Sequence, residues 1–382
     1  MSRIPLSHPD LNDKDIRALT RDLVNEPLVG GRMTDQLEEA LASRTGQGDA
    51  VSAGTYADAA RLVLLAMDIH AGDEVILPAF ASGTMTQAVM SVGATPVFAD
   101  CHPRTLNIAP QAIEDCMTAD TRAVVATTVF GNPAGLPQLA ALCGLLEIPL
   151  IEDVAGGLGG TIDGRPAGSF GRAAIIDMGM RSVISCGEGG AICTSDAHMA
   201  DRCRRLRNGE DLASTRAPGP HTGPLGLRCP LTTPQAGLAL PQVNRLNDIM
   251  EARSLVAATY TQRLAGVSDV IVPTVDPGTT LGWPEFVIRL DESYGTDDRN
   301  EIVQGLDRHE IGAARPWIPP PRRPQVLSRL EPKAVEAGWP VAEFIAQRTV
   351  ALPMFGTLTD RDVSLVTQTL ELMMQRATFR RS

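Results

Sequence analysis

The stretch Pro149-Leu150-Ile151-Glu152-Asp153 is a short apolar run that ends in two carboxylates and leads into a glycine-rich turn. Similar apolar runs, separated by helical patterns or turns, occur on both sides of it, at 51–55, 73–78, 96–100, 123–127, 174–177 and 190–194. Apolar runs of this length between helices are typical of a mainly parallel sheet that is covered on both faces. The sequence therefore predicts an α/β protein.

The segments around this core predict two domains. Residues 9–25 and 33–45 have the spacing of amphipathic helices, and a loop rich in glycine and proline spans about 208–234. A long amphipathic helix over about 235–265 could bridge the domains, and alternating strands and helices follow it. We expect a large domain over 1–245 and a smaller C-terminal α+β domain over 246–382.

Composition excludes several classes of function. The chain has 382 residues and a net charge of −11, which disfavours general binding to nucleic acid or an anionic membrane. It contains no apolar run long enough to span a bilayer and no signal-peptide pattern at its start, so we expect a cytoplasmic protein. The seven cysteines are scattered and the six histidines are dispersed, so we expect free thiols and no metal site.

Short motifs occur in a fixed order along nearly the whole chain. They are Gly54-Thr55 and the stretches 72–76, 93–98, 151–153, 164–171, 187–190, 204–208, 311–316 and 352–353. Together they resemble the DegT/DnrJ/EryC1/StrS family of sugar aminotransferases, which use pyridoxal phosphate (PLP). The resemblance implies an aspartate-aminotransferase-like fold (PLP fold type I), in which the large domain carries a mixed, mainly parallel, seven-stranded-type sheet. It also implies a homodimer with active sites at the subunit interface.

The resemblance places Arg181, six residues before Gly187, where the family has the lysine that forms a Schiff base with PLP. A guanidinium stays protonated and offers no free amine to an aldehyde. The chain has two lysines, Lys14 and Lys333, and neither follows a strand in a glycine-rich setting. We therefore expect an atypical member that cannot form the internal aldimine.

Two positions of the family's cofactor site are retained. By resemblance, Asp153 would contact the pyridine nitrogen of PLP, although an aspartate at a strand end can also cap the following turn. Gly54 and Thr55 lead into a helix whose free N–H groups favour a phosphate. Asp58, one turn into that helix, would oppose a bound dianion if it faced the pocket, or could simply stabilise the start of the helix.

Other positions differ from the family. Ser82 stands at the position of the aromatic residue that stacks on the cofactor, Gly156 at that of a glutamine or histidine, and Ile176 at that of a phosphate-binding serine. Arg228 corresponds to an asparagine that the partner subunit contributes. These changes together predict that no cofactor is bound covalently, and that neither PLP nor its amine form, pyridoxamine phosphate (PMP), is the usual occupant.

What fills the pocket instead is left as a hypothesis. Arg181 could pair with Asp153 in place of the pyridinium ring, or with Asp177 if the segment between them is helical. The predicted catalytic candidates are Arg181, Asp153, Asp177 and Glu188, and the vestigial cofactor pocket, which could bind substrate, would use Gly54, Thr55, Ser82 and Asp153. Cys186 could act as a nucleophile or serve as a small apolar filler beside the glycine turn.

Three functions are compatible with these residues. The first, which we prefer, is a PLP-independent enzyme or metabolite-binding protein in bacterial sugar or natural-product biosynthesis. The second is a non-catalytic subunit that pairs with a lysine-bearing homologue. The third is a sugar aminotransferase or dehydratase that holds PLP or PMP non-covalently. The expected ligand is a small molecule, such as a sugar, a nucleotide sugar or an amino-acid derivative, and the expected assembly is a homodimer or such a heterodimer.

Overall fold

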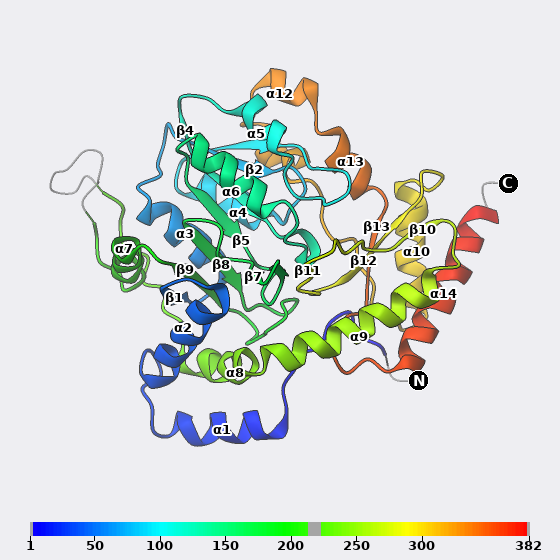
Figure 1. Cartoon of the computed structure of the whole chain (residues 1–382), viewed down its shortest axis with the longest axis horizontal. Helices are drawn as coiled ribbons and strands as arrows, with labels where there is room; N and C mark the ends of the chain where they lie inside the picture. The colour runs from blue at the N-terminus through cyan, green and yellow to red at the C-terminus, as the bar shows by residue number, and fades with distance from the viewer. Residues whose placement is uncertain (1–2, 213–222, 380–382) are drawn as a thin grey trace.

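A seven-stranded sheet forms the centre of the computed structural model, which describes residues 3–212 and 223–379 (Figure 1). From one edge to the other its strands are β1 (Asp49–Ala53), β9 (Gly190–Thr194), β8 (Ala173–Asp177), β5 (Leu150–Asp153), β4 (Thr121–Thr127), β2 (Glu74–Pro78) and β3 (Thr95–Ala99). Only β9 runs antiparallel to its neighbours, β1 and β8. The predicted α/β fold with a mainly parallel mixed sheet is confirmed.

Helices cover both faces of this sheet because its strands are apolar on both sides. Within β5, Leu150 belongs to one buried cluster and Ile151 to the other, and Ile176 and Ile175 of β8 divide in the same way. The cluster that contains Ile151 includes buried residues of α3 (Tyr56–Ala66), α4 (Gly83–Ser91) and α7 (Ala197–Arg207). The other includes residues of α2 (Arg32–Thr45), α5 (Pro110–Cys116), α6 (Leu136–Leu145) and α8 (Thr233–Asn244).

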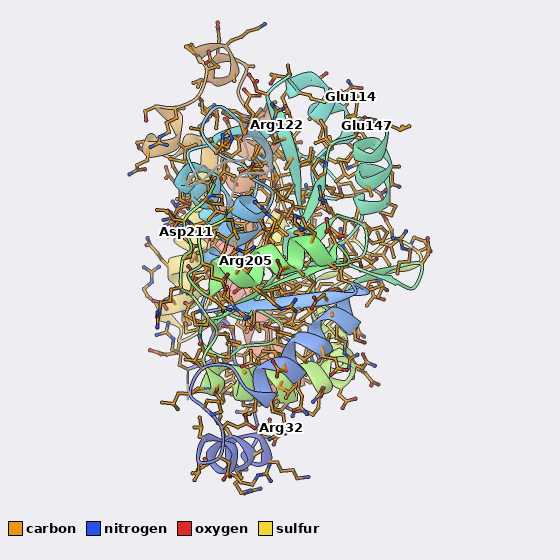
Figure 2. The ribbon with its side chains drawn as sticks, turned by 90° about the vertical axis from the view of Figure 1, so that its left-hand side faces the viewer. Arg32, Glu114, Arg122, Glu147, Arg205 and Asp211 are labelled. Carbon is orange, nitrogen blue, oxygen red and sulfur yellow. The ribbon has the colours of Figure 1, made fainter. Side chains whose placement is uncertain are left out.

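Figure 2 shows these layers from the side. Arg205 marks α7 at the front, and Glu114 on α5 and Glu147 just after α6 lie along the right-hand side. Successive buried residues along each strand therefore pack alternately against one helical layer and the other.

The C-terminal part contains its own sheet and its own core. Strands β10 (Val270–Ile271), β12 (Phe286–Leu290) and β13 (Thr349–Leu352) form an antiparallel sheet, and α10 (Thr296–Arg308) and α14 (Asp360–Phe379) lie beside it in Figure 1. A third buried cluster lies here and also includes Ile4, whose backbone pairs with Ile311. The domain boundary at residue 245 stays a prediction.

The remaining elements are short or peripheral. Strands β6 (Thr161–Ile162), β7 (Arg165–Pro166) and β11 (Thr279–Thr280) form a small sheet. Helix α1 (Asp13–Leu23) packs on α8, and the 3₁₀ turn η1 (Val129–Gly131) follows β4. The proline-rich region contains the 3₁₀ turn η2 (Pro320–Arg322) and the short helices α11 (Pro324–Leu327), α12 (Pro332–Ala337) and α13 (Pro340–Ala346). No described helix combines the length and the apolar composition that a bilayer-spanning segment needs.

The prediction of a single helix over about 235–265 is wrong. The structure has two helices, α8 and α9 (Leu246–Leu264), with a break at Arg245, whose ψ of 16° is outside the helical range. Pro241 lies inside α8, one turn before the break, where its missing N–H weakens the ladder of hydrogen bonds, while the Arg245 N–H still bonds to the Pro241 carbonyl at 3.1 Å. Arg245 is held in place by ion pairs with Asp10 and Asp15.

The register of the sheet brings distant residues together at its carboxyl edge. Thr127 at the end of β4 pairs with Asp153 at the end of β5. Gly190, the first residue of β9, pairs with both Ala53 of β1 and Asp177 of β8. The start of α3, which follows β1 directly, is therefore placed beside the ends of β5 and β8.

Gly190 allows α3 to approach the sheet this closely. A Cβ at this position would lie 2.6 Å from the carbonyl oxygen of Thr55 and 2.7 Å from the Cα of Tyr56. We expect Gly190→Ala to lower the free energy of unfolding by about 1–3 kcal/mol, because backbone atoms would have to move.

The matched control is Gly144→Ala in α6, where a Cβ would meet no atom within 4 Å. This change should be neutral or stabilising by up to about 1 kcal/mol, because alanine favours a helix. Urea unfolding followed by circular dichroism measures both, and equal effects of the two changes would contradict the packing argument.

Candidate functional site

The carboxylate of Asp153 lies at the centre of the candidate site. Its residue is 1% exposed, and its two oxygens accept hydrogen bonds from Thr127 Oγ1 at 3.2 Å and from the Ala155 N–H at 3.1 Å. Among the residues that the structure describes, no basic side chain pairs with it. Burial without a counter-charge raises the pKa of Asp153 to about 6, and the nearby carboxylate of Asp177 adds to this shift.

Tyr56, the first residue of α3, lies against Asp153 and was not among the predicted site residues. Its residue is 8% exposed, and its hydroxyl lies close enough to Asp153 to oppose the rise in the pKa of that carboxyl, although it forms no hydrogen bond of ordinary geometry within the described part of the chain. Burial raises its pKa well above the usual value, and the charges of Asp153 and Asp177 act in the same direction. The phenol therefore stays protonated.

Asp177 forms the second carboxylate of the site. It accepts a hydrogen bond of 2.8 Å from the Gly179 N–H, so the segment after β8 is a turn and not the helix that would pair Asp177 with Arg181. Burial raises the pKa of Asp177, while the adjacent hydroxyl of Ser182 opposes the shift. Ser182 is 7% exposed, and its Oγ lies beside Asp177 without a hydrogen bond of ordinary geometry in the described structure.

Thr55 caps the helix that follows β1. Its Oγ1 accepts the Asp58 N–H at 3.0 Å and donates to Asp58 Oδ2 at 2.8 Å, so Asp58 stabilises the start of α3. That carboxylate also lies 3.7 Å from the position of a Cβ on Gly54. The N–H groups at the start of α3 remain suited to an anion, although Asp58 reduces the local positive potential.

The hypothesis that Arg181 pairs with Asp153 is wrong. Arg181 forms an ion pair with Glu285, which directly precedes β12, and its side chain is 42% exposed. Glu285 is largely buried, which raises its pKa, and Arg181 opposes this rise. Arg181 therefore links the β8–β9 connection to the C-terminal sheet and does not enter the site.

The other predicted residues divide into two groups. Ser82 precedes α4 and lies near the Tyr56 hydroxyl, so it belongs to the site. Glu188 is exposed but close enough to Asp177 for its charge to raise the pKa of that group. Arg228 is exposed and packs beside Gly209 of its own chain, away from Asp153.

Two further positions singled out in the sequence are closely packed. Pro284 fills the space beside Gly156, because a Cβ there would lie 3.1 Å from Pro284 Cγ and 3.3 Å from the Gly131 nitrogen. Cys186 is buried and its pKa is raised to about 12, so it acts as an apolar filler and not as a nucleophile.

A pattern in the sequence could have revealed some of the missed residues. Thr127, Asp153 and Asp177 follow Val125, Ile151 and Ile175 by two residues each, and those three belong to one face of the sheet. Side chains two residues apart in a strand point the same way, so this spacing predicts a polar cluster at the end of that face. Tyr56 gave no such signal.

The order and geometry of these elements match a known family over most of the chain. The model of the DegT/DnrJ/EryC1/StrS aminotransferase family matches residues 9–371. The chain belongs to this family.

Relatives and solved structures resemble the chain over nearly its full length. The spore coat polysaccharide biosynthesis protein SpsC of Bacillus subtilis (strain 168) is 29% identical over 375 residues, which cover 94% of each chain. DesI, solved in the presence of its TDP-sugar product, is 25% identical with a TM-score of 0.89 over 100% of this chain and 95% of DesI. The putative sugar aminotransferase Spr1654 of Streptococcus pneumoniae, in its PLP form, is 21% identical with a TM-score of 0.89 over 98% of this chain and 99% of Spr1654.

Our expectation about the cofactor is corrected by these comparisons. We expected no covalently bound cofactor and neither PLP nor PMP as the usual occupant. The family is one of aminotransferases, and Spr1654 has been solved in both PLP and PMP forms, so a cofactor of this type is to be expected. The chain is shown to be a member of a sugar aminotransferase family, whereas the homodimer, the cytoplasmic location and the partner role of Arg228 stay predictions.

The buried charge of Asp153 predicts a stability that depends on pH. Because its pKa rises from 3.8 to about 6 on folding, ionisation destabilises the folded protein as pH increases through this window. The free energy of unfolding of Asp153→Asn, relative to that of the unmodified protein, should increase by about 2 kcal/mol between about pH 4.5 and pH 8. Urea unfolding at each pH measures this difference.

The control for this measurement is Asp49→Asn. A hydrogen bond from Arg204 lowers the pKa of Asp49, so its ionised form stabilises the fold at neutral pH and this contribution is lost as pH falls. The two substitutions should therefore differ in the sign of their pH dependence. A pH-independent effect of Asp153→Asn would contradict the burial argument.

Removing Arg181 should leave the carboxylate of Glu285 buried without a partner. We expect Arg181→Met to lower the free energy of unfolding by about 1–3 kcal/mol, with a smaller loss at acidic pH, where Glu285 is protonated. The double variant with Glu285→Met should be more stable than Arg181→Met alone. If the effects of the two substitutions on the free energy of unfolding simply added in a double-mutant cycle, the ion pair would contribute no coupling energy, against this expectation.

Proposed function

We propose that this protein carries out amino-group chemistry on a sugar substrate with a PLP or PMP cofactor that it holds without a covalent bond. The observation that supports the proposal is the composition of the site: it has a buried acid and a helix start, but no amine. Lys14 on α1 and Lys333 on α12 are the two lysines of the chain, and both are exposed. Arg181 is engaged by Glu285.

The residues fit two ends of such a cofactor. Asp153 would contact the ring nitrogen, and the N–H groups at the start of α3 would hold the phosphate, with Asp58 weakening this end. The hydroxyls of Tyr56 and Ser182 lie buried beside carboxylates without hydrogen bonds of ordinary geometry, and a ligand could satisfy them better. When bound, a cofactor of this kind supplies an electron sink for bond changes at the carbon that carries the amino group.

The chain's own residues would control protons and orientation. Above about pH 6 Asp153 is ionised and can keep a proton on the ring nitrogen, while Thr127 and Ala155 fix the direction of its carboxylate. Asp177 is the candidate acid–base group, because burial raises its pKa towards the working range and the Gly179 N–H orients it.

The class of substrate is inferred from the named relatives. SpsC is named for polysaccharide biosynthesis and DesI was solved with a TDP-sugar product, so we propose a sugar, free or linked to a nucleotide, as the substrate of this chain. We infer that the relevant chemistry adds, removes or replaces an amino group on that sugar.

A trapping experiment tests the non-covalent mode. The protein is incubated with PLP, reduced with borohydride and analysed by intact-mass and peptide mass spectrometry. We expect no adduct at the site, and we expect gel filtration to remove bound cofactor. A stoichiometric adduct on Lys14 or Lys333, with activity lost when that lysine is replaced, would overturn the proposal.

Two added lysines sharpen the experiment. Ser182→Lys places an amine beside Asp177, whereas Arg181→Lys places one towards Glu285. We expect borohydride to trap PLP on the first variant and not on the second. Trapping on Arg181→Lys alone would mean that the side chain at 181 reaches the cofactor, against the proposed arrangement.

A further inference from the structure

Tyr56 lies between the points that define the expected cofactor position. It follows Gly54 and Thr55, the phosphate end, as the first residue of α3. Its hydroxyl lies near Asp153, the ring-nitrogen end, and near Ser82, the position of the stacking residue. A single aromatic side chain thus extends from one end of the expected cofactor position to the other.

The sheet independently fixes this placement. Asp153 and Asp177 follow Ile151 and Ile175 by two residues and point to the same face, and Tyr56 is buried in the cluster on that face. Gly190 pairs with Asp177 and lies against the backbone of Tyr56, which holds the start of α3 close to the carboxylates.

The surroundings of the Tyr56 hydroxyl are unusual for a buried phenol. It is buried beside the carboxylates of Asp153 and Asp177. Apolar contacts hold the ring, while its polar end faces Asp153 without a hydrogen bond of ordinary geometry in the described chain. Such a side chain can be displaced by a ligand that satisfies Asp153 better.

We propose that the ring of Tyr56 occupies the cofactor's place beside Asp153 in the cofactor-free protein and must move out before PLP or PMP can bind. This inference rests on the proposed function. It makes Tyr56 a built-in competitor, since the observed affinity for the cofactor is the intrinsic affinity reduced by the fraction of molecules in which Tyr56 is displaced.

Binding measurements on the full chain test the inference. PMP and PLP are titrated separately by calorimetry into the unmodified protein and into Tyr56→Ala and Tyr56→Phe. We expect Tyr56→Ala to bind PMP at least about tenfold more tightly, because the competing ring is gone. Tyr56→Phe keeps the ring and should stay close to the unmodified protein.

Phe98→Ala provides the matched control. Phe98 on β3 is 6% exposed and belongs to the same buried cluster, where it packs on Trp339, so its removal creates a cavity without vacating the space beside Asp153. Its affinity for PMP should be unchanged. Thermal unfolding of every variant checks that the fold is retained. If Tyr56→Ala does not fold, Tyr56→Phe still tests the inference. Binding of PMP that is about tenfold tighter in Tyr56→Phe would assign the effect to the hydroxyl and overturn competition by the ring.

The outcomes separate this inference from the proposed function. If the unmodified protein binds PMP non-covalently and Tyr56→Ala binds it equally or more weakly, Tyr56 is not a competitor and the inference fails alone. If neither protein binds PLP or PMP, both fail. A stopped-flow association rate that levels off with PMP concentration in the unmodified protein, but not in Tyr56→Ala, would support displacement as a separate step.

Discussion

The carboxylate of Asp153 is buried at the end of β5 with two hydrogen-bond donors and, among the described residues, no basic partner. Isolated charges of this kind are costly in a protein interior, so the surroundings determine whether the group ionises. Thr127 and Ala155 only partly offset the loss of water, and Asp177 increases the cost. The site is therefore electrostatically incomplete in a way that a ligand carrying a positive group or a hydrogen-bond donor would correct.

The position of Arg181 shows how this state is maintained. A guanidinium on the turn after β8 is close in sequence to Asp177, yet Glu285, just before β12 of the C-terminal sheet, engages it instead. Two consequences follow from this one ion pair. The β8–β9 connection is tied to β12, and no cation of this turn neutralises Asp153. The family fold is thus kept, while the chemistry at its centre depends on what enters the site.

The fold could be predicted from the sequence because it depends on periodic patterns. The apolar runs around 149–153 gave the strands, and their alternation gave the two covered faces. The break at Arg245 was missed because the apolar spacing continues across it, and only Pro241 hinted at a helix end. At the site, Asp153 was found from its place at a strand end. The partner of Arg181 could not be found, since Glu285 lies more than a hundred residues away and no periodicity links the two. Tyr56 was missed because its role depends on a close approach of backbones at Gly190.

The exposed positions of Lys14 on α1 and Lys333 on α12 have a practical consequence for handling the molecule. Reagents that acylate amino groups will find side-chain targets at only these two places, and neither belongs to the group of residues around Asp153. A fluorophore or a solid support attached through such chemistry would thus leave that group chemically intact, which is rarely the case in enzymes whose central group is itself an amine.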